Sequence, residues 1–228
     1  MDKTIQGLLY EKLLDLIGKI YKLHSDFSTE FSILENVELI NLKKKQIRHV
    51  TSVSDETELF TINKSFYQLI MGYTERLKKL TYDIELEYDF IEFDLRLRVK
   101  QPDSIVNKLK YYRVGKPEQG KIDLNKCLND LLGFRIIFKQ FDHNDEYFKK
   151  IGEKISQIYS NRVMIRDSSK LNYKATHVYF YGESNKYFPW ELQIWDPDNL
   201  TTNDKSHTLH KQEYTKWAEI YKNSSEIS

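Results

Sequence analysis

The chain has 228 residues, of which 40% are hydrophobic and 30% charged, and its 35 Lys and Arg nearly balance 34 Asp and Glu. This length suits one well-filled core with an appendage, or two small domains. The near-neutral net charge excludes a surface that is basic overall and binds nucleic acid non-specifically. No apolar run approaches the ~20 residues of a membrane span, and the single Cys127 excludes an intramolecular disulfide; we expect a cytoplasmic protein without a membrane partner.

Two amphipathic helices are predicted in the first part of the chain. Apolar residues recur at helical spacing over residues 4–23 and again over residues 63–81, where Asn63 is a suitable N-cap. The segment between them shows no clear periodicity. We therefore predict a helical extension over residues 1–85, which either forms an oligomer interface or covers a domain formed by residues 86–228.

Helices and strands alternate in the rest of the chain. A helix is predicted over residues 104–112 with Asp103 as its cap, and its spacing places Ser104 and Lys108 on one face. A loop and a short helix follow. Further strands are predicted at residues 134–138, 162–166, 177–181 and 190–195, and further helices at residues 147–159 and 210–221. This mixture is typical of an α+β fold.

The last predicted strand alternates strictly in character. Leu192 and Ile194 are expected to point toward a core, and Glu191, Gln193 and Trp195 toward the opposite face. A strand of this kind can present polar side chains to a ligand while its other face is buried.

Four polar segments follow one another in this part of the chain, namely RVKQPDSIVNK (98–108), NDLLGFR (129–135), NYKATH (172–177) and ELQI (191–194). Such residues suit phosphoryl and pyrophosphoryl transfer, which need neutralisation of the negative charge on the transferred group, a divalent metal and a positioned acceptor hydroxyl. Asp130 and Glu191 are carboxylates that can share one Mg²⁺ with substrate phosphates. Glu191 can also accept the proton of the attacking hydroxyl.

In their order and composition these segments resemble the synthetase domain of the RelA/SpoT alarmone synthetases, in its small stand-alone form. The resemblance implies a nucleotidyltransferase-like mixed β-sheet flanked by helices, and transfer of the β,γ-pyrophosphate of ATP to a ribose 3′-hydroxyl with release of AMP. It implies catalytic and metal-binding roles for Asp130 and Glu191. It further implies ATP binding by Arg98, Lys100, Ser104, Lys108 and Arg135, and acceptor binding by Tyr173, Lys174, His177 and Gln193.

The acceptor side departs from the family pattern more than the ATP side. Asn172 stands in place of the usual Gly before the tyrosine, the basic residue after it is Lys174, and ELQIWD replaces a segment that normally has an Arg-Thr ending. The identity of the acceptor is therefore less defined by the resemblance than the identity of the donor.

Three functions follow from these observations. The first is an alarmone synthetase that uses GDP or GTP. The second is a toxic relative that modifies the 3′ end of tRNA or makes adenosine alarmones, in which a basic cluster would contact tRNA phosphates; this cluster consists of Lys43, Lys44, Lys45 and Arg48. A solvated loop also explains that cluster. The third is a non-catalytic nucleotide sensor, which the presence of both carboxylates disfavours. An antitoxin or other regulatory protein and a second copy of the chain are further partners consistent with this family.

Overall fold

A five-stranded mixed sheet forms the centre of the computed structural model, which describes residues 3–34, 39–54 and 59–220. The strands lie in the order β3-β4-β7-β6-β5, and only the β4–β7 pair is parallel. Their bounds are β3 Arg96–Val99, β4 Leu132–Ile137, β5 Val163–Asp167, β6 Thr176–Phe180 and β7 Trp190–Trp195. The predicted α+β fold with a mixed sheet is confirmed.

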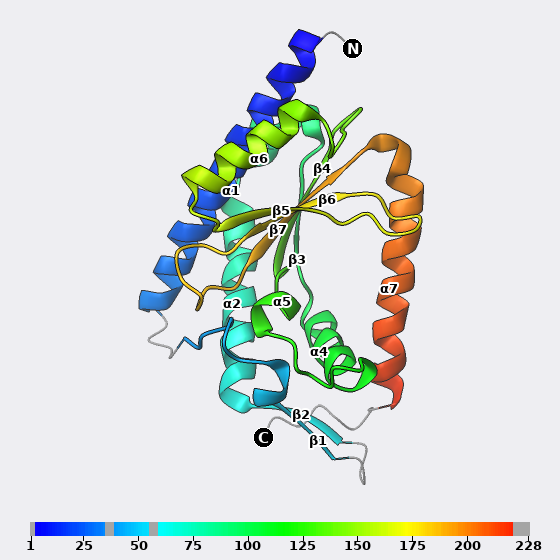
Figure 1. Ribbon diagram of the computed structural model, residues 1–228. Coiled ribbons are helices and arrows are strands. Elements are labelled where there is room, and N and C mark those ends of the chain that lie inside the picture. Colours follow the sequence, from blue (N-terminus) through cyan, green and yellow to red (C-terminus); the bar gives the residue numbers. More distant parts are fainter. Residues whose placement is uncertain (1–2, 35–38, 55–58, 221–228) are drawn as a thin grey trace.

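Helices cover both faces of this sheet. They are α1 (Lys3–Leu34), α2 (Lys64–Asp83), α3 (Leu86–Asp89), α4 (Pro102–Lys110), α5 (Leu124–Cys127), α6 (Glu146–Ile158) and α7 (Leu200–Ile220). Helices α1 and α6 run side by side on one side of the sheet, and α7 stands on the other side, where α4 packs against it (Figure 1). A small hairpin, β1 (Thr51–Ser54) with β2 (Leu59–Ile62), lies apart from the main sheet.

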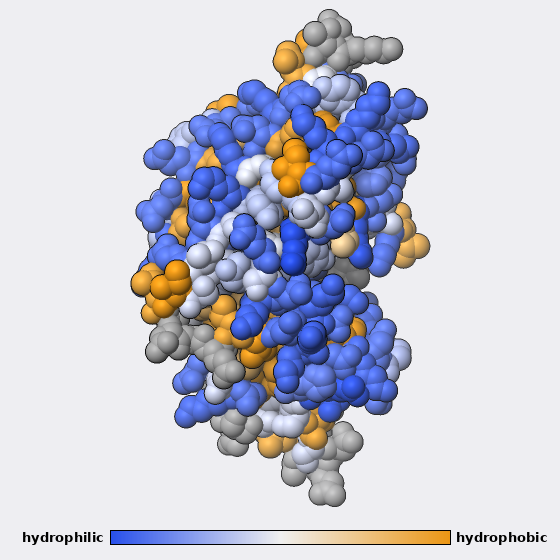
Figure 2. Space-filling model, turned by 60° about the vertical axis from the view of Figure 1, so that its left-hand side comes forward, coloured by the Kyte–Doolittle hydropathy of each residue, from blue (hydrophilic) through white to orange (hydrophobic). Residues whose placement is uncertain are grey.

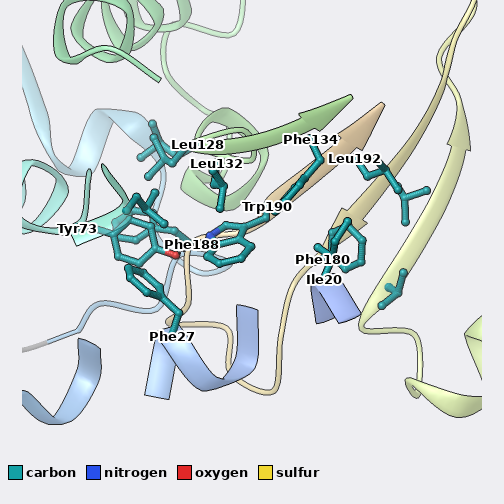
Figure 3. Packing of buried hydrophobic residues seen from close by; sticks show 14 of the residues in the cluster. Ile20, Phe27, Tyr73, Leu128, Leu132, Phe134, Phe180, Phe188, Trp190 and Leu192 are labelled. Atoms are coloured by element: carbon teal, nitrogen blue, oxygen red, sulfur yellow. Dashed lines mark hydrogen bonds between the residues drawn. The ribbon is translucent and has the colours of Figure 1, made fainter. Parts of the chain in front are cut away.

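The main core lies between the sheet and the N-terminal helices. Trp190 of β7 is fully buried, contacts Phe27 of α1 and Phe134 of β4, and donates a hydrogen bond from Nε1 to Tyr73 Oη of α2 at 2.8 Å (Figure 3). Residues of α1, α2 and the sheet belong to one continuous hydrophobic cluster. The N-terminal helices thus cover the sheet, which was one of the two roles expected for them. The division into two domains at residue 85 stays a prediction.

Several element bounds differ from those predicted. Helix α4 begins at Pro102 with Gln101 as its N-cap, so Asp103 is not the cap; proline fits the first helical position because that position needs no amide hydrogen. Helix α1 continues to Leu34 rather than ending at residue 23. The Asn63 cap is confirmed, since its side chain accepts a hydrogen bond from the Phe66 amide at 3.1 Å.

The C-terminal helix was also predicted too short. Helix α7 begins at Leu200, ten residues before the predicted start at residue 210, whereas residue 221 at the predicted end lies outside the described residues. Its first ten residues are largely polar and carry no apolar stripe, because they pack on a polar face of the sheet. This difference matters for the site, which α7 borders.

The surface in Figure 2 is mostly hydrophilic, with hydrophobic residues in small scattered groups. Within the described parts of the chain, no helix combines the length and the apolar character that crossing a bilayer requires. Scattered apolar side chains of this kind are ordinary on a protein surface and indicate no particular site.

Candidate active site

Strand register places the predicted site residues in two rows on one face of the sheet. One row crosses the sheet from Arg98 through Gly133 and Glu191 to Tyr179, and the next row contains Arg135, Gln193 and His177. Paired residues of neighbouring strands share a face. Residues as far apart in sequence as Gly133 and Glu191 are therefore direct neighbours in space, and helices α4 and α7 lie over the same face.

Asp130 forms the centre of a cationic cluster at the start of β4. Lys100 Nζ, directly after β3, donates to Asp130 Oδ2 at 2.6 Å, and Lys108 Nζ, on α4, donates to Oδ1 at 3.0 Å. Both lysine side chains are about nine-tenths buried. Burial by itself would raise the pKa of the Asp130 carboxyl, but Lys108 and Lys100 outweigh it and hold that pKa well below its usual range. The cluster has one surplus positive charge, which suits a phosphate group.

Glu191 lies at the start of β7 in a second network. Its Oε1 accepts from His177 Nδ1 at 2.8 Å, and its Oε2 accepts from Gln193 Nε2 at 2.7 Å. With Nδ1 protonated, His177 Nε2 accepts from the Tyr173 hydroxyl at 2.7 Å. Burial raises the pKa of Glu191, and the hydrogen bond and electrostatic interaction with His177 lower it; the balance is a lowered pKa, although nearby Asp130 opposes it. A buried ionised carboxylate of this kind can accept a proton or contribute to a metal site.

The ATP-side residues occupy three elements. Arg98 is exposed on β3, and Ser104 is half-buried one helical turn before Lys108 on α4, so the predicted i, i+4 relation is confirmed. The Arg135 guanidinium carbon lies 3.7 Å from the Trp195 ring centroid, and Arg135 Nη1 lies 3.6 Å from Asp204 Oδ1 of α7. Roles in ATP binding remain predictions for all five residues.

The acceptor-side residues are brought together only in part. Tyr173, His177 and Gln193 are linked to Glu191 through the hydrogen bonds described above. Lys174 has an exposed side chain, and its backbone amide and carbonyl are bound by the Asn203 side chain of α7 at 2.9 and 2.8 Å. The structure thus shows Lys174 as an attachment point for α7, and a contact of its ammonium group with an acceptor stays a prediction.

The basic cluster of Lys43, Lys44, Lys45 and Arg48 is exposed on a turn and the short 3₁₀ helix that follows it. The Lys45 carbonyl accepts from the Leu124 amide at 2.9 Å, and the Leu42 carbonyl accepts from the Asn125 amide at 3.1 Å. These bonds fix the turn against α5, which leads within three residues of its end to Asp130. The turn that carries the cluster is therefore anchored to the segment that leads to Asp130.

Four residues of this face carried no predicted role, namely Tyr179, Trp195, Asp204 and His207. Tyr179 and Trp195 follow site residues at spacing i+2 on their strands, so alternation alone indicates them. Asp204 and His207 have no such signal, because the helix that carries them was predicted to begin after them. His207 packs its ring on Trp195 at 5.3 Å with an interplanar angle of 26°.

The two carboxylates fit the chemistry that Mg²⁺ prefers. Each is ionised at neutral pH, and Mg²⁺ needs only one or two protein carboxylates when substrate phosphates complete its coordination. Among the described residues, no group of three or more His, Cys, Asp or Glu side chains is arranged to hold a metal ion. Any Mg²⁺ at Asp130 and Glu191 would therefore depend on the phosphates of a bound nucleotide.

Comparison with known proteins completes the description of the site. None of the curated proteins compared with the chain matches it. Among solved structures, the chain is similar to small alarmone synthetase 1 from Bacillus subtilis bound to AMPCPP, with 16% identity, coverage of 68% of this chain and 89% of that chain, and a TM-score of 0.30. The family model for the region found in RelA/SpoT proteins matches residues 97–219, which is more than half of the sequence, and the chain therefore belongs to the RelA/SpoT family.

Proposed function

We propose that this protein is an ATP-dependent pyrophosphokinase that transfers the β,γ-pyrophosphate of ATP to the 3′-hydroxyl of GDP or GTP. Membership of the RelA/SpoT family supports a pyrophosphate-transferring enzyme in general. The observation that carries the proposal is the cluster of Lys100, Lys108 and Asp130 on the same face as the hydrogen-bonded Glu191. Together these groups offer cations for phosphates and a carboxylate for the acceptor hydroxyl.

In the proposed reaction the 3′-hydroxyl oxygen forms a bond to the β-phosphorus of ATP. The bond from that phosphorus to the oxygen that bridges to the α-phosphate breaks, and AMP leaves. Glu191 accepts the hydroxyl proton, and Lys100 and Lys108 turn from Asp130 to the charge of the transferred group. When bound by Asp130 and Glu191, Mg²⁺ supplies further neutralisation of phosphate charge.

The test is incubation of the purified protein with γ-³²P-ATP and Mg²⁺ in separate reactions that contain GDP, GTP, AMP or bulk tRNA. Products are resolved into free nucleotides and RNA, and AMP release is measured in parallel. Label in ppGpp or pppGpp supports the proposal, and label in tRNA alone identifies the second candidate described below. ATP binding without transfer to any acceptor would instead identify a nucleotide sensor.

The second candidate is transfer to the 3′ end of tRNA. It is favoured by the exposed basic cluster, which backbone hydrogen bonds hold against the segment that leads to Asp130. Lys and Arg side chains that contact phosphates would dock an acceptor stem beside the site without reading its sequence.

Replacement of Lys43, Lys44 and Lys45 together by Ala separates the two acceptors. Transfer to tRNA should fall by about 10-fold or more near 0.15 M salt and become less salt-dependent, because up to three phosphate contacts are removed. Transfer to GDP should be unchanged. A matched control replaces the three exposed lysines of α6, namely Lys149, Lys150 and Lys154. Equal loss with both acceptors would show that the basic turn is structural.

The proposal also includes a cytoplasmic location, where ATP and these acceptors are available. Control by an antitoxin or another regulatory protein, and self-association, stay predictions from the family resemblance. Size-exclusion chromatography with light scattering at several concentrations would test self-association directly.

A further inference from the structure

The Arg135 side chain is held in one orientation by two neighbours. Its guanidinium carbon lies 3.7 Å from the Trp195 ring centroid, and its Nη1 lies 3.6 Å from Asp204 Oδ1. The side chain is half-buried. A long flexible side chain such as Arg normally loses considerable rotamer freedom when it binds a ligand, and a guanidinium that is already stacked loses less.

Trp195 is itself firmly supported. It is fully buried at the end of β7, with the His207 ring stacked on it at 5.3 Å and the Tyr173 ring edge-on at 6.1 Å and 87°. Burial, together with the nearby Arg135 cation, lowers the pKa of His207 to about 4, so its imidazole is neutral at pH 7 and does not repel Arg135. The position of Arg135 is therefore set by a rigid strand residue and by helix α7.

There is open space over Gly133, on the same face of β4 as Arg135. Gly133 stands two residues before Arg135 on β4 and directly opposite Arg98 on β3. A side-chain carbon at Gly133 would meet nothing closer than the Arg98 carbonyl oxygen at 3.9 Å. No side chain at Gly133 therefore stands on this face of the sheet between Arg98 and Arg135.

We propose that Trp195 is a positioning residue for the donor nucleotide, which holds the Arg135 guanidinium as a preformed platform for the adenine of ATP. This inference rests on the proposed function, because it takes ATP as the donor. Two residues of α7 complete this support. Asp204 lies beside the Arg135 guanidinium, and His207 stacks on Trp195. The role of Trp195 is to act through Arg135, without touching the reacting atoms.

Calorimetric titration with Mg²⁺–AMPCPP and, separately, with Mg²⁺–tripolyphosphate tests the proposal. Trp195→Leu should weaken binding of AMPCPP by about 5- to 30-fold, because a stacked cation–π support is lost. Binding of tripolyphosphate, which has no base, should change by less than about 2-fold, because Lys100, Lys108 and Asp130 are untouched. Trp195→Phe keeps an aromatic ring and should recover most of the affinity for AMPCPP.

Trp190→Phe is the matched control, since Trp190 lies on the same strand but faces the hydrophobic core on the other side of the sheet. It should lower stability without changing the ratio of the two affinities. His207→Ala and Asp204→Ala remove the outer supports without altering the strand, and should weaken AMPCPP selectively by about 2- to 5-fold. These two variants keep the test decisive if Trp195→Leu does not fold.

Two results would overturn the proposal. One is unchanged AMPCPP affinity in the Trp195 and α7 variants, and the other is an equal loss of affinity for AMPCPP and tripolyphosphate. Failure of the unaltered protein to bind AMPCPP at all has a different meaning, because it would contradict the proposed function itself.

Discussion

Glu191 is a buried residue that accepts hydrogen bonds at both of its carboxylate oxygens. Buried carboxylates normally have raised pKa values, yet His177 and Gln193 keep that of Glu191 below its ordinary value. The group is therefore charged at neutral pH, although no Lys or Arg among the described residues forms an ion pair with it. Such a carboxylate can accept the proton of the acceptor hydroxyl, provided that the substrate displaces one of the hydrogen bonds to Glu191.

Glu191→Gln should lower pyrophosphate transfer by about 10²- to 10⁴-fold while AMPCPP binding stays within a few-fold, because the proton acceptor is lost but the Lys100–Asp130–Lys108 cluster remains. AMP release and calorimetry measure the two effects. Glu183→Gln, at an exposed loop position after β6, is the control. An active Glu191→Gln protein would reject the assigned role.

For single residues, the sequence predicts which side chains face the site better than it predicts which groups they contact. Alternation on β7 correctly separates Glu191 and Gln193 from Leu192 and Ile194, because a strand has only two faces. The ion pairs of Asp130 with two lysines depend on long-range packing of β3, α4 and β4. No local sequence pattern predicts these ion pairs. The placement of Asp204 and His207 is not predicted by a local pattern either.

Helix α1 is joined to the sheet layer through a buried histidine. His24 Nε2 donates to the Phe188 carbonyl at 2.9 Å, and its ring packs edge-on against Trp190. Gly182 has φ of 60°, and a side-chain carbon there would lie 2.5 Å from the His24 ring. Glycine is therefore required at this position by both backbone conformation and space.

Burial lowers the pKa of His24 from 6.5 to about 4. Because the folded-state pKa lies below the unfolded-state value, this contribution to stability is present above pH 6.5 and is lost as pH falls toward 4. Between pH 7.5 and pH 5 the free energy of unfolding should fall by about 2 kcal/mol from this group. Urea denaturation at both pH values measures it.

His24→Gln should remove most of that pH dependence, since glutamine does not titrate and its amide can donate to the same carbonyl. If the His24→Gln protein loses stability between pH 7.5 and pH 5 as steeply as the parent protein, the buried histidine is not the titrating group.

Element bounds were predictable where periodicity is strong. Strand β7 has the predicted bounds, and α6 is shifted by one residue at each end, because both carry a clear apolar pattern. The start of α7 was missed because residues 200–209 face a polar site and lack an apolar stripe. The hairpin β1–β2 was missed as well, since four-residue strands give little periodic signal.

The molecule is built around a core to which its N-terminal and C-terminal parts both contribute. Leu13, Leu16, Ile17 and Ile20 of α1 are fully buried in the same cluster as Phe134, Val178 and Leu192 of the sheet. Figure 3 shows Ile20 beside Phe180 at one end of this cluster and Phe27 near Tyr73 at the other. Helix α1 is thus part of the catalytic unit's hydrophobic interior.

Unfolding by urea should be one cooperative transition, with coincident curves from tryptophan fluorescence and far-UV circular dichroism. Leu16→Ala should lower the free energy of unfolding by about 3 kcal/mol and shift both curves together, because it leaves a cavity in the shared core. Leu8→Ala, at a position of the same helix that is 64% exposed, should change stability little. Separate transitions for α1 and the sheet would contradict a shared core.

The two faces of strand β7 differ in how well they tolerate substitutions. Trp190, Leu192 and Ile194 are committed to the interior, so changes there risk the fold. Glu191, Gln193 and Trp195 lie on the opposite face, where we propose that nucleotides bind, and a substitution there should have less effect on the packing between the sheet and α1. A lineage could therefore change what the protein recognises by altering one face of a single strand, while the packed scaffold behind the other face is inherited unchanged.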